Sequence, residues 1–241
     1  MTAFRPCVLI PTYDNPATVR AVVERARAHC PDVIVVDDGS GPEARAALDA
    51  VAREGLAHVH RRPQNGGKGA AVKTGLDVAW ARGFTHALQV DADGQHALDD
   101  IPRFLAISQE NPGALVLGAP LFDESAPKSR LRARKITIFW TNFEAGRGVI
   151  EDPMCGFRVY PIAPARAAGA RGDAMDFDPE VAVKMAWLGV PVINVPTRVR
   201  YVPREQGGVS HFRMVRDNAL ISWMHTRLSL TRIARAMKLP G

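Results

Sequence analysis

Short apolar runs alternate with longer segments of helical character over the first half of this chain, and this alternation constrains the fold more than any other feature. The runs that have the length and composition of strands are CVLIP (7–11), DVIVVDD (32–38), AHVHR (57–61), HALQV (86–90) and ALVLG (114–118). The intervening segments with helical patterns are 15–30, 41–55, 69–83 and 98–110. Strands and helices that alternate in this way build a mostly parallel sheet with helices on both faces. The sequence therefore predicts an α/β fold with a Rossmann-like sheet.

Residues at the edges of these segments indicate where the helices begin and end. Asn15 is a candidate N-cap, with Pro16 at the first helical position. Pro42 opens the next helix and Gly55 closes it, while Gly83 closes the third. The first helix is therefore expected to begin at Pro16.

The composition fits a soluble globular chain of one large or two small domains. Of its 241 residues, 46% are hydrophobic and 23% are charged, which provides enough apolar material for a sizeable core. The formal net charge of +6 suits an anionic partner such as nucleic acid, a phosphorylated ligand or a lipid surface, without choosing among them.

Cysteine usage and the N-terminal sequence indicate the compartment. Cys7, Cys30 and Cys155 are scattered and form no CxxC pair, so neither a disulfide framework nor a zinc site is indicated. Each is expected to be a small core residue in a reducing compartment. The N-terminus lacks the apolar stretch of a signal peptide, and no apolar run approaches the roughly 20 residues of a spanning helix. A cytoplasmic location is the expectation.

Polar side chains follow several of the predicted strands at the point where each strand ends. They lie in Thr12–Asp14 after the first strand, Asp37–Ser40 after the second and Asp91–Asp93 after the fourth. In open parallel sheets, ligands bind beyond the carboxyl ends of the strands. Polar groups that converge there predict a binding pocket.

Common nucleotide and calcium motifs do not account for these residues. The chain contains no GxGxxG, so the dinucleotide-binding fingerprint is absent. NGGKGAA (65–71) is not a phosphate-binding P-loop, because Lys68 is followed by Gly69 instead of Ser or Thr. DADG (91–94) begins like a calcium loop, but its Gly comes two places early and Pro102 stands where Glu is needed.

The D-x-D sequence at the end of the fourth strand is a candidate metal site. Asp91 and Asp93 can point the same way because alternate strand residues share a face, and Gln95 follows two residues later. Their oxygens are hard ligands suited to Mg²⁺ or Mn²⁺. Mg²⁺ commonly completes its shell with substrate phosphates and water, so the pattern predicts a cation that holds a diphosphate.

Six motifs follow one another along the chain: VLIPTYDN (8–15), VIVVDDGS (33–40), NGGKGAAVKTGL (65–76), QVDADGQH (89–96), DPMCGFRVY (152–160) and REQGGVSHF (204–212). This ordered set resembles the family 2 glycosyltransferases, in particular the dolichol-phosphate mannose synthase and polyprenyl-phosphate sugar transferase branch. The resemblance covers nearly the whole chain. It implies a GT-A fold, a nucleoside-diphosphate sugar donor, a divalent metal, inversion at the anomeric carbon and a lipid-linked acceptor.

The resemblance also implies which residues bind the ligands. Nucleotide-sugar contacts are expected from Pro11, Tyr13, Asn15, Val36, Asp38, Lys68, Asp91, Ala92, Asp93, Arg130, Arg204 and His211. Metal ligands are expected to be Asp93, Gln95 and Asp91.

The chain departs from the family pattern at several of these places. Asn15 replaces a usual Glu, and His211 replaces a usual Lys. The sequence Gly118–Pro120 lacks a diphosphate-binding Arg, for which Arg130 or Arg134 could substitute.

Asp152 and Asp91 are the expected catalytic residues. Asp152, just before Pro153, resembles the family's general base. A cap for the turn at Pro153 is an equally good interpretation, and a phosphate acceptor would need little or no base. A sugar-phosphate nucleotidyltransferase and a non-catalytic nucleotide-sugar-binding module are the alternative functions.

Several other residues have competing interpretations. Lys68 is either a ligand contact in a Gly-rich loop or a solvated charge. Asp178 is expected to be a helix N-cap, and Arg158 is either an ion-pair partner or a phosphate ligand. Trp80 and Trp187 are expected in the core.

The expected domain organisation is a GT-A domain over 1–211 and a helical tail over 212–241. The domain would divide into a nucleotide-binding half, about 1–120, and an acceptor half, about 121–211. In the tail, basic residues occupy one arc of a helix over 212–239 and apolar residues an adjoining arc. Such a helix can bind the inner membrane surface peripherally, or can instead dock on the protein core or on a second copy. No nucleic-acid partner is expected, and the oligomeric state stays open.

Overall fold

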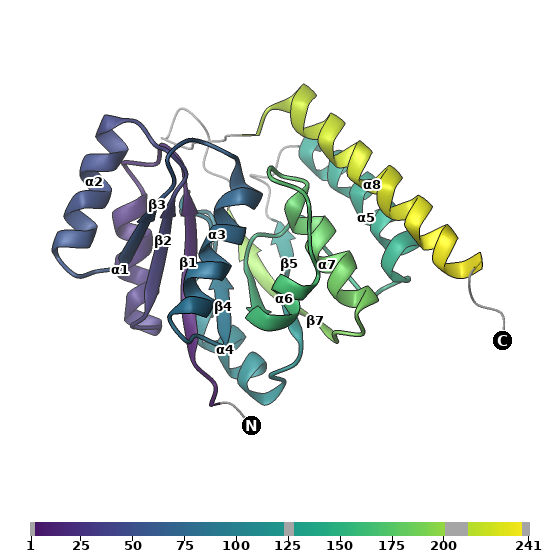
Figure 1. The fold of residues 1–241 in the computed structure, drawn as a ribbon, viewed down its shortest axis with the longest axis horizontal. Coiled ribbons are helices and arrows are strands. Elements are labelled where there is room, and N and C mark those ends of the chain that lie inside the picture. Colours follow the sequence, from purple (N-terminus) through teal and green to yellow (C-terminus); the bar gives the residue numbers. More distant parts are fainter. Residues whose placement is uncertain (1–2, 123–127, 201–211, 238–241) are drawn as a thin grey trace.

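The computed structural model describes residues 3–122, 128–200 and 212–237. For residues 128–130 it describes the backbone only. A seven-stranded sheet runs through it in the order β3-β2-β1-β4-β6-β5-β7 (Figure 1). The strands are β1 (Pro6–Thr12), β2 (Val33–Asp37), β3 (His58–Arg61), β4 (His86–Gln89), β5 (Leu115–Phe122), β6 (Arg158–Pro161) and β7 (Val192–Val199).

Most neighbouring strands are parallel, as the alternation of strands and helices predicts. β1 pairs in parallel with β2 and β4, β2 with β3, and β5 with β7. β6 runs antiparallel to both of its neighbours, β4 and β5. The predicted mostly parallel α/β fold is confirmed, whereas the reversed strand β6 was not predicted. The carboxyl ends of β1, β2 and β4 meet at one edge of the sheet.

Helices cover both faces of this sheet (Figure 1). They are α1 (Val19–His29), α2 (Pro42–Arg53), α3 (Lys68–Ala81), α4 (Ile101–Glu110), α5 (Lys128–Ala145), α6 (Ile162–Ala167), α7 (Phe177–Trp187) and α8 (Met214–Met237), with a short 3-10 turn, η1 (Leu98–Asp100), before α4. One buried cluster joins α3, α6, α7 and α8 to the sheet, and the other joins α1, α2 and α4 to it.

The continuous apolar runs follow from burial on both faces of the sheet. In β1, Cys7 and Leu9 belong to one cluster, while Val8 and Ile10 belong to the other. Successive strand residues point to opposite faces, so a strand covered on both sides must be apolar throughout. Cys7, Cys30 and Cys155 are all buried and free, which confirms that each is a core residue.

The first helix begins later than the sequence predicts. Asn15 is not its N-cap: α1 starts at Val19 with Thr18 in the capping position. The side-chain amide of Asn15 instead donates to the carbonyl of Tyr13 at 2.8 Å, while the backbone carbonyl of Asn15 accepts from the backbone N–H of Val19 at 3.1 Å. A separate turn after the strand therefore precedes the helix.

The C-terminal helix α8 packs on the domain through one of its faces. Ile221, Met224 and Leu228 are buried in the same cluster as α3 and α7. His225 Nδ1 lies 2.9 Å from a carboxylate oxygen of Glu144 on α5, and both side chains are buried. The alternative in which this helix docks on the protein core is therefore correct for the face that carries these buried residues. Within the described ranges, no helix is long and apolar enough to cross a membrane.

The two tryptophans expected in the core, Trp187 and Trp80, differ in how far their side chains are exposed. Trp187 is partly buried, and its Nε1 donates to the carbonyl of Glu144 at 2.8 Å. The expectation for Trp80 was wrong, because this side chain is 46% exposed. It lies beneath the guanidinium of Arg166, 5.3 Å from the ring centroid, so a surface cation covers the apolar ring instead of the core.

Candidate active site

A pocket of about 630 Å³ opens at the carboxyl ends of β1, β2 and β4. Val36 does not line it, because its side chain is fully buried in the core. Arg204 and His211 lie outside the described residues, as does the side chain of Arg130. The expected site residues that do line the pocket are Pro11, Tyr13, Asn15, Asp38, Lys68, Asp91, Ala92, Asp93 and Gln95.

Some strand-end carboxylates shape turns instead of facing the pocket. Asp37 Oδ1 accepts a hydrogen bond from the backbone N–H of Ser40 at 2.9 Å. Asp14 Oδ1 accepts one from the backbone N–H of Gly41 at 2.7 Å, next to the start of α2. Neither residue is among those that line the pocket.

Asp38 is buried and is fixed by the Gly-rich loop that precedes α3. Its Oδ2 accepts from the backbone N–H of Gly67 at 2.7 Å, and its Oδ1 accepts from that of Gly66 at 3.1 Å. The guanidinium of Arg62 forms an ion pair with the same carboxylate. Asp38 therefore joins the loop to the strand end and holds both at the pocket.

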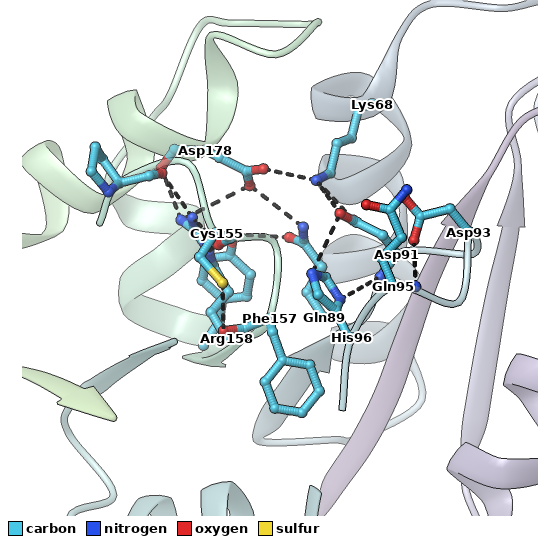
Figure 2. Close-up of polar contacts among 12 residues, drawn as sticks. Lys68, Gln89, Asp91, Asp93, Gln95, His96, Cys155, Phe157, Arg158 and Asp178 are labelled. Carbon is cyan, nitrogen blue, oxygen red and sulfur yellow. Dashed lines mark hydrogen bonds and ion pairs between the residues drawn. The ribbon is translucent and has the colours of Figure 1, made fainter. Parts of the chain in front are cut away.

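Lys68 bridges two carboxylates from distant parts of the chain (Figure 2). Its Nζ lies 2.8 Å from Oδ1 of Asp91 and 3.0 Å from Oδ2 of Asp178. Burial alone would lower the pKa of Lys68, but the charges of Asp178 and Asp91 outweigh burial and raise it above its usual range. Burial acts to raise the pKa of Asp91, yet Lys68 and His96 hold it below its ordinary value. Lys68 is therefore a charged, partly enclosed lysine that positions Asp91, not a solvated loop charge.

Asp178 is not the N-cap that the sequence suggests, because Asp176 holds that position and Asp178 lies in the first turn of α7. Behind it, the fully buried guanidinium of Arg158 donates to the carbonyls of Asp178, Pro153 and Cys155. Arg158 Nη1 also lies 3.9 Å from Oδ1 of Asp178. Of the two interpretations of Arg158, the structural one holds and the phosphate ligand does not, because its guanidinium N–H groups already donate to acceptors inside the protein.

Gly156 leaves the space in which Lys68 and Asp91 meet. A Cβ at this position would lie 2.6 Å from Oδ2 of Asp91 and 2.8 Å from Nζ of Lys68. Sequence reasoning missed this residue and the partnership of Asp178 with Lys68. The motif DPMCGFRVY contains the glycine, but only the fold brings it against Asp91.

Asp93 and Gln95 lie beside Asp91 in the pocket wall (Figure 2). Asp93 Oδ1 accepts from the backbone N–H of Gln95 at 3.0 Å. Burial and the charge of Asp91 raise the pKa of Asp93, and no basic side chain of the described residues forms an ion pair with this carboxylate. A divalent cation would supply the offsetting positive charge, and the oxygens of Asp93 and Gln95 fit Mg²⁺ or Mn²⁺.

The protein offers few ligands for such a cation. Among the described residues, no group of three or more His, Cys, Asp or Glu side chains could hold a metal. Mg²⁺ sites often use one or two carboxylates, with substrate phosphates and water in the other positions. The donor set therefore fits a metal that binds together with a diphosphate.

Asp152, the expected general base, is not among the residues that line the pocket. Its Oδ1 accepts from the backbone N–H of Met154 at 2.9 Å, and its Oδ2 is paired with Nε of Arg134. This geometry matches the turn-capping alternative, and a base role for Asp152 stays a prediction. Arg134 itself lines the pocket.

The N-terminal end of α8 also forms part of the pocket wall. Arg213, Arg216, Asn218 and Ile221 line it together with Asp217, whose Oδ2 accepts from the backbone N–H of Arg213 at 2.6 Å. The sequence did not indicate that this helix lines the pocket. The available signal was its basic residues, because a pocket for anionic ligands needs cations.

The family model described as Glycosyl transferase family 2 matches residues 7–168, which is more than half of the chain. The chain belongs to this family. The family 2 chain is 34% identical over 165 residues to a polyprenol monophosphomannose synthase of Mycolicibacterium smegmatis, a match that spans 65% of this chain and 61% of that protein. It is 28% identical over 215 residues to an undecaprenyl-phosphate mannosyltransferase of Micrococcus luteus, with 84% and 86% of the two chains covered. The family and branch that the motifs indicate are confirmed.

Solved structures confirm the fold of this family 2 glycosyltransferase. Glucosyl-3-phosphoglycerate synthase from Mycobacterium tuberculosis, crystallised with Mn²⁺ and uridine-diphosphate-glucose, superposes with a TM-score of 0.70. The superposition covers 95% of this chain and 79% of that chain at 16% sequence identity. At this identity the likeness establishes the GT-A fold alone.

Proposed function

We propose that this chain transfers a sugar from a nucleoside-diphosphate sugar to the phosphate of a polyprenyl-phosphate acceptor, with inversion at the anomeric carbon. The observation that carries the proposal is the pocket at the strand ends, whose wall includes Asp38, Asp91 and Asp93. The acceptor class is supported by relatives named for polyprenol and undecaprenyl-phosphate mannosyl transfer.

Two kinds of side chain would hold the donor. Pro11 and Tyr13 give the pocket an apolar wall suited to a nucleotide base, next to Asp38. Asp91 lines the pocket and is fixed by Lys68, so its carboxylate would have a set orientation in which to accept hydrogen bonds from sugar or ribose hydroxyls. A carboxylate that is already oriented costs no reorganisation when the ligand binds.

Asp93 and Gln95 would hold the divalent cation, Mg²⁺ or Mn²⁺. Bound there, it would offset the negative charge that develops on the departing nucleoside diphosphate. Asp91 would contribute little charge to cation binding, because Lys68 already offsets its negative charge. Its main contribution would be its fixed position.

The acceptor side of the proposal rests on charge. A phosphate acceptor is anionic at neutral pH and attacks with little or no help from a base. This agrees with the engagement of Asp152 by Arg134 and a turn N–H. Arg213 and Arg216 in the pocket wall would attract the phosphate, since guanidinium groups pair well with phosphate oxygens.

A transfer assay tests this function. The protein is incubated with labelled nucleoside-diphosphate sugars, polyprenyl phosphate and Mg²⁺ or Mn²⁺, with dephosphorylated polyprenol as the matched control. We expect label in the phosphate-containing lipid only, and none in excess chelator. Pyrophosphate released from a nucleoside triphosphate and a sugar phosphate would instead reveal a nucleotidyltransferase. Nucleotide-sugar binding without turnover of any donor would reveal a non-catalytic module.

A further inference from the structure

Large apolar side chains are exposed mainly on two neighbouring helices. Thirteen large hydrophobic residues are exposed among the described residues. Those on α5 are Ile136, Phe139, Trp140 and Phe143, and those on α8 are Met214, Val215, Trp223, Leu230, Ile233 and Met237. On α5, the ring of Trp140 contacts the rings of both Phe139 and Phe143. Exposed apolar patches mark protein or membrane contacts more often than ordinary solvent-facing surface.

Each helix carries these residues as a stripe. On α5 their spacing of three and four residues places them on one face. On α8, Val215, Trp223, Leu230, Ile233 and Met237 fall within an arc of about 80° at 100° per residue. The buried residues Ile221, Met224 and Leu228 fall on the opposite side of the helix. The exposed stripe is therefore additional to the face through which α8 docks.

The two helices α5 and α8 lie side by side (Figure 1). His225 and Ser229 of α8 both contact Glu144 of α5. Near their N-terminal ends, Ala133 and Arg134 of α5 line the same pocket as Arg213 and Arg216 of α8. A surface that received both stripes would therefore lie next to the pocket.

In the described parts of α5 and α8, the exposed charged side chains are basic. The only acidic residues in the described parts of α5 and α8 are Glu144 and Asp217, and both are buried. The exposed basic residues are Arg132, Lys135, Arg213, Arg216, Arg232 and Arg235. Beside Trp223, a groove of about 530 Å³ is lined by three arginines, Arg171, Arg216 and Arg227, and by two carboxylates, Asp173 and Asp176. A phosphate head group would find guanidinium donors there.

We propose that α5 and α8 together form a lipid-docking platform that holds the pocket against an anionic bilayer. The aromatic and aliphatic stripes enter the interface, and the arginines beside them meet the head groups. A second copy of the chain is a poorer occupant, because a self-complementary contact would bring the same positive surfaces together. The proposed function gives the platform its purpose, since the lipid surface carries the acceptor, but lipid binding itself does not depend on turnover.

The sequence pattern alone pointed only to the last helix, and α5 is the new element. Its contribution can be measured with three exposed tryptophans on different helices. Trp140 on α5 is 40% exposed, Trp223 on α8 is 63% exposed and Trp80 on α3 is 46% exposed. Trp80 is the matched control, because it is outside the proposed platform.

Sedimentation with liposomes, without donor or acceptor, tests the platform. The full chain and the variants Trp140→Ser, Trp223→Ser and Trp80→Ser are mixed with vesicles of phosphatidylglycerol and phosphatidylcholine, or of phosphatidylcholine alone. We expect salt-sensitive binding to the anionic vesicles. Trp140→Ser and Trp223→Ser should each weaken it severalfold, and the double variant by roughly tenfold or more, because interfacial binding scales with buried apolar area. Trp80→Ser should bind as the wild type does.

Fluorescence gives a readout that leaves the α5 stripe unchanged. In the variant Trp80→Phe, Trp187→Phe, Trp223→Phe, Trp140 is the only tryptophan left. We expect its emission to shift to the blue and to be quenched by lipids brominated in the acyl chain. An unshifted, unquenched Trp140 on vesicles that bind the protein would show that α5 stays in water and would overturn the proposal.

Other results would also overturn it. The proposal is wrong if the wild type does not bind anionic vesicles at low salt, or if all variants bind them equally. It is also wrong if the protein forms a concentration-dependent dimer that the Trp140→Ser substitution dissociates. Failure of the proposed function is distinguishable, because it would leave vesicle binding intact while no sugar is transferred. Failure of the platform would leave transfer to a short, detergent-soluble polyprenyl phosphate intact.

Discussion

Lys68 holds one positive charge between Asp91 and Asp178 in a mostly enclosed site. Removal of one partner from a buried charged group leaves the others uncompensated, which typically costs about 3–5 kcal/mol. We therefore expect Lys68→Met to lower the free energy of unfolding by about that amount. Urea denaturation measures it.

Lys73, on the same helix, provides the control. Its Nζ lies 2.7 Å from Oδ1 of the exposed Asp173, and surface pairs contribute only about 0–1 kcal/mol. Lys73→Met should therefore leave stability nearly unchanged. Equal losses in the two variants would contradict the bridging role of Lys68.

Gly156 should matter for activity because of what a side chain would displace. The added Cβ of Gly156→Ala would lie 2.6 Å from Oδ2 of Asp91, so the carboxylate must move. A misplacement of about 1 Å can lower a rate by about 100-fold, and we expect a loss of that order in sugar transfer. Gly113→Ala is the control, since nothing lies within 4 Å of its added Cβ. Full activity of Gly156→Ala would show that the position of Asp91 is not critical.

His86 should make stability depend on pH. Its Nε2 faces the carbonyl of Pro112 at 2.9 Å, which fixes the proton there, and its Nδ1 accepts from the hydroxyl of Thr85. Burial lowers the pKa of His86 below its ordinary value of about 6.5. The unfolded chain therefore binds the proton more readily, so this stabilisation is complete above pH 6.5 and is lost as pH falls through the lower folded pKa.

Thermal unfolding at pH 7.5 and pH 5.5 measures this dependence. We expect the melting temperature of the wild type to fall more on acidification than that of His86→Gln. The comparison between the two proteins removes contributions from other titrating groups, which they share. An equal fall in both would contradict the assignment to His86.

The sequence was sufficient to locate Asp38, Asp91 and Asp93, because each follows a strand whose carboxyl end must lie at the ligand-binding edge. It was not sufficient for Asp178. The role of that residue depends on how α7 packs against α3, and no local pattern encodes that packing. Helix capping is the commoner use of Asp before Pro, and it gave the wrong interpretation here.

At the scale of elements, α8 packs against the folded domain through one face and exposes the other face on the surface. Met224 is fully buried where this helix docks, whereas Met214 is 71% exposed. Met224→Ala should cost about 2–5 kcal/mol, the usual range for a buried large-to-small change. Met214→Ala should change stability by no more than about 0.5 kcal/mol. Equal effects in urea denaturation would show that α8 is a detachable tail.

Strands and helices of the first half could be predicted because apolar runs and helix punctuation are local signals. The antiparallel strand β6 could not. Its RVYP sequence is only four residues long, and a short buried run has no feature that fixes its direction. The start of α1 was predicted too early because Asn15 bonds to Tyr13, a competing use of an Asn side chain that is common before helices.

At the scale of the whole molecule, α8 connects the pocket proposed for sugar transfer with the surface proposed for lipid docking. Its first turns line the pocket, while its exposed stripe lies on the proposed lipid platform beside α5. The donor would enter from water to the strand ends, and the acceptor phosphate would arrive from the bilayer past the arginines of α8. The arrangement requires that a nucleoside diphosphate and a metal bind together at the D-x-D carboxylates.

Calorimetry of nucleoside-diphosphate binding, with and without Mn²⁺, tests that requirement most directly. Coupling between two bound ligands typically changes the affinity of each by about 5–150-fold. We expect Mn²⁺ to tighten nucleotide binding within that range in the wild type and in Asp99→Asn, a control at an exposed surface carboxylate. Asp93→Asn should abolish the effect of Mn²⁺ while its melting temperature without ligands stays near that of the wild type. An undiminished effect of Mn²⁺ in Asp93→Asn would contradict the account.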